Sequence, residues 1–176
     1  MESYLTLRHN PKSEPSKPSK ESTLEIRRAK KEEVGAVSDL IVRVKRLNNE
    51  FDPLFAVVPD VKERADKYLA ATIGADDRLL LVAAEGPKIV GVLRAEMRER
   101  MFYEPHEEGF ITDFYILPEY RRKALGNEMI QKASSELKKM GAQIIVGEVP
   151  AQNEIANRFY VKRGFRGLLN VFGKSP

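Results

Sequence analysis

An apolar, aromatic-rich run that begins at Gly109 ends at Pro118, and a short basic turn and an amphipathic segment follow directly. This order is typical of a strand that runs into the N-terminus of a helix. The unpaired N–H groups of a first helical turn and the positive end of the helix dipole both attract anions. The sequence therefore predicts a phosphate or pyrophosphate site, although a solvated basic helix start shares this short pattern. The site's residues would be Arg121, Arg122, Lys123, Ala124, Leu125, Gly126 and Asn127.

A second block of residues begins at Asn153 and ends at Phe165, with Tyr160 within it. Together with the basic turn, this block resembles the GNAT superfamily of acyl-CoA N-acyltransferases. The family's pyrophosphate loop, Arg/Gln-x-x-Gly/Ala-x-Gly/Ala, matches residues 121–126. Its last block, Asn-x-x-Ala-x-x-x-Tyr-x-x-x-Gly-Phe, matches residues 153–165. The resemblance extends over roughly residues 23–172.

The resemblance implies both a fold and a cosubstrate. The implied fold is a three-layer α/β/α sandwich whose mixed, mostly antiparallel central sheet is splayed at a V-shaped cleft for acetyl-CoA. Ala124 stands where the family more often has glycine, so we expect weaker or slightly shifted phosphate contacts. The other implied acetyl-CoA contacts are Phe114, Tyr115, Ile116, Asn153 and Asn157. The alternative interpretation is that the bulky side chains of Phe114 and Ile116 belong to the core and that Asn153 is a helix N-cap.

Acyl transfer from a thioester to an amine needs a deprotonated amine, a donor for the carbonyl oxygen and a proton for the departing thiolate. Tyr160 matches the family tyrosine that gives this proton. A phenol suits the role, because its usual pKa of about 10 keeps it protonated at neutral pH. The alternative interpretation is a tyrosine that only packs on a helix face.

The general base is less clearly marked. Many family members have glutamate at the position of Thr112, and threonine cannot serve as a base. Asp113 is adjacent, but strand alternation directs it to the opposite face. Glu96, near the end of the preceding strand, is the next candidate, unless it is a surface carboxylate beside Arg94 or Arg98. A water relay, or no base at all, also fits the sequence, because a fraction of an amine is already neutral.

An acidic segment, residues 96–108, precedes this strand and carries a net three negative charges. Negative charge near the acceptor site would favour a cationic amine. Met101, Phe102 and Tyr103 could contact the alkyl part of such an amine, and the loop at 51–59 is the other expected acceptor wall. The alternative is a solvated acidic loop.

Hydrophobic periodicity and turn residues predict the elements that carry these groups. Gly141 and Gly164 are the expected stops of the last two helices. The predicted strands are 24–29, 79–84, 89–97, 110–117, 144–149 and a final one at 165–172, and the predicted helices are 31–47, one through 61–69, 125–140 and one before 164.

Composition excludes several kinds of site. The 176 residues include no cysteine and only two histidines, which excludes disulfides, thiolate nucleophiles, zinc–sulfur centres and multi-histidine metal sites. We therefore expect no metal. The apolar runs are too short for a membrane span, so we expect a cytoplasmic protein without membrane contact. Residues 1–22 read as a flexible tail, and residues 23–176 as a single N-acetyltransferase domain.

The sequence thus predicts an acetyl-CoA-dependent N-acetyltransferase that acts on a primary amine. The acceptor could be a small amine or polyamine, a protein lysine or N-terminus, or an aminoglycoside-like compound. A non-catalytic acyl-CoA-binding sensor is the alternative, because Thr112 replaces the usual glutamate. A nucleic-acid-binding role for the basic tail is disfavoured by the acidic segment and the lack of a basic patch with aromatics. A homodimer is left open.

Overall fold

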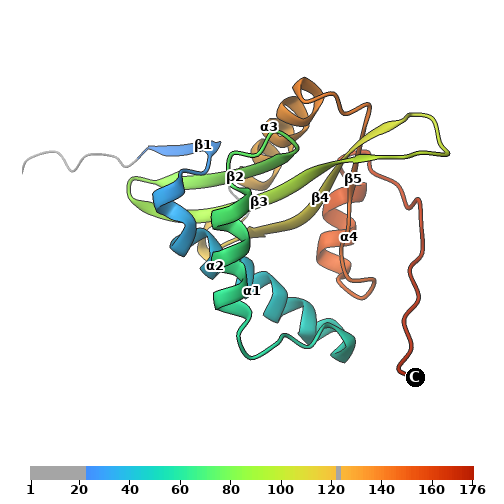
Figure 1. Cartoon of the computed structure of the whole chain (residues 1–176), viewed down its shortest axis with the longest axis horizontal. Coiled ribbons are helices and arrows are strands. Elements are labelled where there is room, and N and C mark those ends of the chain that lie inside the picture. Colours follow the sequence, from blue (N-terminus) through green and yellow to red (C-terminus); the bar gives the residue numbers. More distant parts are fainter. Residues whose placement is uncertain (1–22, 122–123) are drawn as a thin grey trace, which may run out of the picture.

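The computed structural model describes residues 23–121 and 124–176. A five-stranded sheet in the order β1-β2-β3-β4-β5 forms its centre (Figure 1). The first four strands pair antiparallel, whereas β5 is parallel to β4. The strands are β1 Leu24–Arg28, β2 Arg78–Glu85, β3 Lys88–Glu99, β4 Glu107–Ile116 and β5 Ile144–Gly147. This is the mixed, mostly antiparallel sheet that the sequence predicts.

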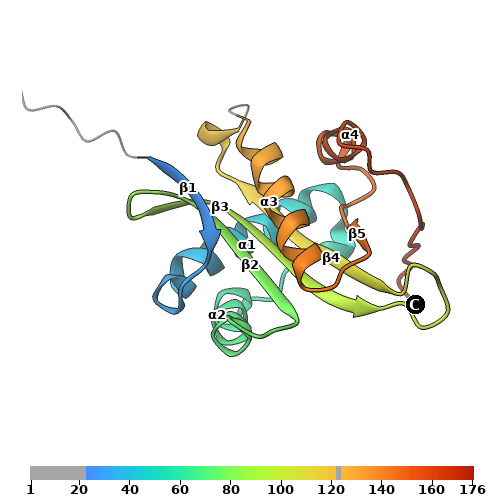
Figure 2. The same cartoon turned by 90° about the horizontal axis from the view of Figure 1, so that it is seen from above.

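Helices cover both faces of the sheet. Figures 1 and 2 show α1 and α2 on one face and α3 on the other. Six consecutive residues of β2 are buried, as expected for a strand that is covered on both faces. The three-layer sandwich is therefore confirmed. The helices are α1 Val34–Phe51, α2 Val61–Thr72, α3 Leu125–Lys139 and α4 Glu154–Val161, with short 3₁₀ turns at Lys31–Glu33, Pro53–Phe55 and Pro118–Tyr120.

The sheet forks between β4 and β5. The two strands pair from Glu108 opposite Ile144 to Ile111 opposite Gly147. The last backbone hydrogen bond runs from Glu148 N to Ile111 O (3.2 Å). Beyond this point β4 continues to Ile116 while β5 has ended, so the far half of β4 keeps an open edge among the described residues. The predicted splay of the sheet is present at this fork.

Two predicted boundaries need correction. The final strand at 165–172 is wrong: this segment is irregular, and Leu169, Val171 and Phe172 are 83%, 87% and 91% exposed. Its apolar composition suits a strand, but no neighbouring strand offers backbone partners. The acidic loop is also shorter than predicted, because β3 extends to Glu99 and β4 begins at Glu107. In the described part of the chain, no helix has the length and apolar character that crossing a membrane requires.

Candidate active site at the fork of the sheet

The predicted phosphate loop lies between β4 and α3. Ala124 caps α3 in the left-handed conformation, with φ of 60°, which is uncommon for a residue with a Cβ. Its carbonyl accepts hydrogen bonds from the N–H groups of Asn127 (2.8 Å) and Glu128 (3.1 Å), which starts the helix. Arg121 Nε donates to the carbonyl of Ile116 (2.9 Å), so it ties the loop to the end of β4. Arg122 and Lys123 lie outside the described residues.

Gly126 allows α3 to approach α4 closely. A Cβ at this position would lie 2.9 Å from Cε2 of Phe159. The ring of Phe159 in turn lies 5.6 Å from that of Phe114 on the open half of β4. Leu125 and Ile116 are core residues, 1% and 8% exposed, so mainly their backbone groups remain for a ligand.

A groove of about 410 Å³ runs between α3 and the end of α4. Arg163 lies on its wall and stacks on Phe159, 3.5 Å from guanidinium carbon to ring centroid. The same guanidinium donates to the carbonyl of Phe159 (2.7 Å). Lys162 lines the same groove, so two cationic side chains, those of Lys162 and Arg163, share it with Asn127.

Both asparagines of the second block hold the start of α4. The side-chain oxygen of Asn153 accepts from the N–H of Ala156 (3.1 Å), an N-cap contact that satisfies a free donor of the first turn. Asn157 Nδ2 donates to the carbonyl of Ala151 (3.0 Å). These contacts fix the approach of α4 to the fork.

Tyr160 lies on α4 beside the end of β5. Its ring packs edge-on against Phe159 (5.6 Å) and Phe165 (5.0 Å), and the residue is 9% exposed. A Cβ on Gly147 would come 3.1–3.2 Å from this ring and its hydroxyl oxygen, so the glycine makes room for the phenol. Burial, together with the negative charge of Asp113, raises the pKa of Tyr160 above its usual value. The phenol is therefore neutral at physiological pH.

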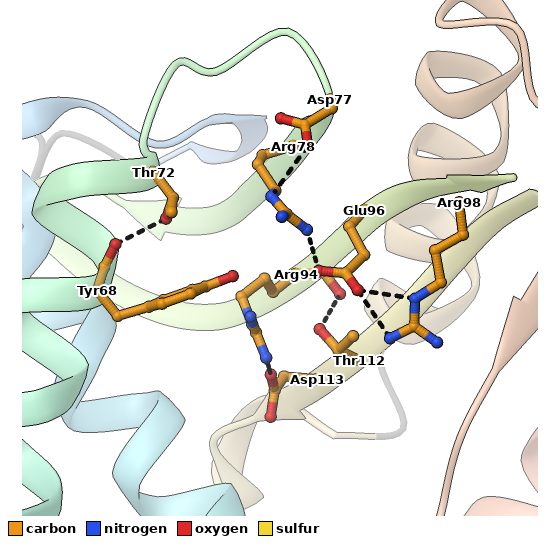
Figure 3. Close-up of polar contacts among 9 residues, drawn as sticks. All are labelled: Tyr68, Thr72, Asp77, Arg78, Arg94, Glu96, Arg98, Thr112 and Asp113. Carbon is orange, nitrogen blue, oxygen red and sulfur yellow. Dashed lines mark hydrogen bonds and ion pairs between the residues drawn. The ribbon is translucent and has the colours of Figure 1, made fainter.

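Asp113 carries a buried carboxylate just beyond the fork. Its side chain is 1% exposed, and Arg94 on β3 binds one oxygen through Nε (2.7 Å) and Nη2 (2.6 Å). Lys45 Nζ on α1 lies 2.6 Å from the other oxygen. Burial is the largest influence on the pKa of Arg94 and lowers it, but the charge and the hydrogen bond of Asp113, with smaller contributions from Tyr68 and Glu96, together raise that pKa overall. Figure 3 shows Arg94 between Asp113 and the ring of Tyr68, whose centroid is 5.0 Å from the guanidinium carbon.

A bulge in β4 gives Asp113 this direction. Arg94 pairs with Asp113 and Ala95 pairs with Ile111, so Thr112 is the extra residue. The hydroxyl of Thr112 donates to the carbonyl of Arg94 (3.2 Å). Bulges interrupt the alternation of side chains along a strand. The simple alternation assumed from the sequence therefore does not apply at Asp113, which points toward Arg94 and α1.

Glu96 lies farther from the fork. It pairs with Phe110, a residue of β4 that still has a β5 partner. Its two oxygens are bound by Arg78 and by Arg98, the latter at 2.7 Å (Figure 3). Glu96 thus sits in an arginine cluster on β2 and β3, and Asp113 is the carboxylate at the fork.

Comparison with known proteins identifies the family. The acetyltransferase (GNAT) family matches residues 41–165. The chain belongs to this family. A comparison with curated proteins gives no match. Similar solved structures include a predicted acetyltransferase with acetyl-CoA from Clostridium acetobutylicum, at TM-score 0.71 and 14% identity, covering 87% of this chain and 96% of that one.

Two further structures resemble this GNAT acetyltransferase. The aminoglycoside N-acetyltransferase AAC(6′)-Iy in complex with CoA has TM-score 0.69 at 15% identity, covering 92% of this chain and 99% of that one. The aminoglycoside 6′-N-acetyltransferase AAC(6′)-IG from Acinetobacter haemolyticus has TM-score 0.69 at 18% identity, with coverages of 86% and 97%. At these identities the likeness concerns the fold.

Two residues at the fork of this GNAT acetyltransferase were missed by sequence reasoning. Arg94 and Lys45 both bind Asp113. A signal for Lys45 exists, because Val37 and Ile41 belong to the buried stripe of α1 and Lys45 follows at the same spacing of four. A lysine that continues an apolar stripe needs a buried acidic partner.

The two expected acceptor walls are exposed. Met101, Phe102 and Tyr103 form the tip of the β3–β4 hairpin and are 67%, 85% and 67% exposed. Leu54 and Phe55, in the connection from α1 to α2, are 56% and 46% exposed. Within the acidic segment, Glu99 pairs with His106 (3.1 Å) and Glu108 with Arg100 (3.5 Å), while Glu104 is exposed.

Proposed function

We propose that this GNAT acetyltransferase moves the acetyl group of acetyl-CoA to a primary amine by direct attack in a ternary complex at the fork. The observation that carries the proposal is the convergence of three elements on the end of the β4–β5 ladder. The open edge of β4 begins there, the phenol of Tyr160 on α4 lies against Gly147 at the end of β5, and the buried carboxylate of Asp113 lies two residues beyond the last pair of the ladder. Acetyl-CoA would supply the thioester whose C–S bond breaks as the C–N bond forms.

The cosubstrate would lie along the open edge of β4. Leu117 N donates to the carbonyl of Val90 on β3, so by alternation the backbone groups of Phe114 and Ile116 face the open edge and would pair with the pantetheine amides. The carbonyl of Ile116 already accepts from Arg121. The phosphates would lie at the first turn of α3, from Ala124 to Asn127. The first N–H groups of a helix, here those of Leu125 and Gly126, have no partner within it, and together with the helix dipole they favour anions. Lys162 and Arg163 in the adjoining groove support this placement, because they extend the positive charge beyond the loop.

Tyr160 is the proposed general acid. Its raised pKa keeps a proton available for the leaving thiolate, and its ring is fixed by two aromatic neighbours and by Gly147. A positioned acid typically contributes 10²–10⁴-fold to a rate.

Two carboxylates are candidates for the general base. Asp113 is supported by its place at the fork and by its contact with a primary amine, that of Lys45. Glu96, the candidate from the sequence, is supported by its nearness to the same strand pair, but it is held by two arginines away from the open edge. A water relay from either carboxylate would serve equally.

The acceptor is proposed to be a cationic amine. The net negative charge of residues 96–108 supports this, and so does the likeness to aminoglycoside acetyltransferases, whose acceptors are amines. A small amine, a polyamine and a lysine side chain share this chemistry. We further propose a cytoplasmic location from the composition.

The alternative function is a non-catalytic acyl-CoA sensor, which Thr112 favours because it cannot act as a base. Turnover decides between the two. Purified protein is mixed with acetyl-CoA and a panel containing a polyamine, a lysine peptide and an aminoglycoside, and release of free thiol is measured. We expect thiol release with at least one amine, and a loss on the order of 10²-fold or more in kcat for Tyr160→Phe. Calorimetric binding of CoA without turnover of any amine would favour the sensor.

A further inference from the structure

Lys45 places a primary amine at the candidate active site. Its Nζ lies 2.6 Å from Asp113 Oδ1, and the side chain is 35% exposed. The buried residues Val37 and Ile41 direct this stripe of α1 toward the sheet. The amine is thus held by the structure, and about a third of its side chain remains exposed.

Two further reactive groups lie near the same end of the β4–β5 ladder. Asp113 lies two residues beyond Ile111, the last residue of β4 that pairs with β5. The ring of Tyr160 lies against Gly147, which is the partner of Ile111. The charge of Asp113 also acts on the phenol, since it adds to the burial that raises the pKa of Tyr160. The amine from α1 and the carboxylate from β4 are therefore in contact, and the phenol from α4 lies near the same end of the β4–β5 ladder.

We propose that Lys45 is a self-acetylation site of this protein. The inference rests on the proposed function, because the donor is the same acetyl-CoA. It names an acceptor that is built into the chain, beside the carboxylate that would deprotonate a soluble amine.

The chemistry balances with the groups at hand. The Lys45 ammonium gives one proton to the Asp113 carboxylate, and the nitrogen lone pair attacks the thioester carbonyl carbon. The C–N bond forms and the C–S bond breaks, and the thiolate takes the proton of Tyr160. The second nitrogen proton returns to the phenolate through water, and Asp113 releases its proton to solvent. The products are acetyl-lysine, the thiol of CoA and one proton.

Acetylation of Lys45 would persist, because an amide is stable, and it would remove a positive charge from the site, because an acetylated nitrogen is no longer basic. Of the two cationic contacts that Asp113 has in the described structure, only that of Arg94 would remain. The acetyl-lysine side chain would also occupy the acceptor side of the fork. We therefore expect the modified chain to turn over soluble amines more slowly.

Lys62 is a matched control. Its Nζ contacts Asp66 at 2.7 Å, and its side chain is 42% exposed, so its chemistry is close to that of Lys45. Its Nζ also contacts Ser38, Asp39 and the carbonyl of Gly35, all near the start of α1. Lys62 therefore reports the background reaction of acetyl-CoA with an ion-paired surface lysine.

The test incubates the full chain with acetyl-CoA and no added amine, and follows intact mass and acetylated peptides over time. We expect one acetyl group per chain at Lys45, formed on the order of 10²-fold or more faster than at Lys62, because the amine is already positioned. The rate per chain should not change with protein concentration. Lys45→Arg should abolish the modification, Tyr160→Phe should slow it, and Lys62→Arg should leave it unchanged.

Outcomes separate this inference from the proposed function. If a soluble amine is acetylated while Lys45 reacts no faster than Lys62, the self-acetylation is wrong and the acetyltransferase activity stands. A rate that rises with protein concentration would also overturn it, since that indicates transfer between molecules. If CoA binds but neither Lys45 nor any amine is acetylated, both the inference and the catalytic function fail.

Discussion

The ring of Tyr160 rests on the backbone of Gly147, so closely that a Cβ there would lie 3.1 Å from Cε1 and 3.2 Å from the hydroxyl oxygen. Gly147→Ala should therefore displace the phenol from the fork. We expect kcat to fall by roughly 10–10²-fold, because a misplacement of about 1 Å can cost 10² in rate. The check is steady-state kinetics together with CoA affinity, which should stay near wild type. In a Tyr160→Phe background the added methyl should have little further effect on kcat, and additive losses would contradict the assignment.

The raised pKa of Tyr160 predicts two alkaline effects. An ordinary tyrosine has a pKa of about 10. The phenol of Tyr160 in the folded chain should still be protonated at that pH, because its pKa is raised. kcat should therefore show no fall from loss of this acid up to that pH. Folding raises the pKa of Tyr160, so this residue contributes its full stabilisation below about pH 10, the pKa of an unfolded tyrosine. That contribution is lost as the pH rises from there through the folded pKa. Denaturant titrations at several alkaline pH values should show a shallower loss of stability for Tyr160→Phe than for wild type.

Neutralising Asp113 should lower the free energy of unfolding more than neutralising Glu96. Asp113→Asn leaves Arg94 and Lys45 without their carboxylate in a largely buried place, which should cost on the order of 3 kcal/mol of unfolding free energy. Glu96→Gln should cost about 1 kcal/mol or less, because the side chain of Glu96 is 18% exposed whereas that of Asp113 is 1% exposed. Urea titrations measure both values.

The same pair of variants identifies the base. At a temperature where both remain folded, Asp113→Asn should lower kcat by roughly 10²–10⁴-fold, the usual contribution of a positioned base. Glu96→Gln should leave kcat within a few-fold of wild type. The reverse result would make Glu96 the base, as the sequence suggests, and two variants with unchanged kcat would point to an amine that loses its proton to water.

Ala124 should be a strained position. A residue with a Cβ in the left-handed region costs roughly 1 kcal/mol or more relative to glycine. Ala124→Gly should therefore raise the unfolding free energy by roughly that amount, less the larger backbone entropy of glycine in the unfolded chain. Ala56→Gly is the control, because Ala56 has φ of −53°, where alanine is unstrained. This variant should be slightly less stable than wild type. Equal destabilisation of both would show that the strain is absent.

The acidic hairpin should attract a cationic acceptor from a distance. Glu99→Gln with Glu104→Gln removes two exposed charges near its tip, and Glu25→Gln with Glu32→Gln is a control at the start of the domain. The first pair should lower kcat/KM for the best amine at low salt. The effect should fade as the Debye length shortens from ~10 Å at 0.1 M to ~3 Å at 1 M. If both pairs behave like wild type at low salt, the acceptor approaches elsewhere.

The sequence identifies the family and most elements because their signals are local. Helical spacing marks α3, and the sites of turns follow from glycine and proline. The direction of Asp113 is not local, since it depends on one extra residue, Thr112, in the register of β4 against β3. No pattern within β4 alone reveals that register. The strand predicted at 165–172 fails for a related reason: a strand needs a partner as well as a suitable composition.

The ladder that joins β5 to the rest of the sheet is short. β5 has 4 residues, all half-buried, whereas β3 has 12 and β2 has 8, most of them fully buried. The segment that carries Tyr160 is therefore attached more weakly than the core, and it should open locally at a lower free energy. Amide hydrogen exchange should be faster in β5 and α4 than in β2 and β3. A molecule that spans the fork would slow this exchange by tying α4 to β4, so protection of α4 reports cosubstrate binding even in a variant that cannot react.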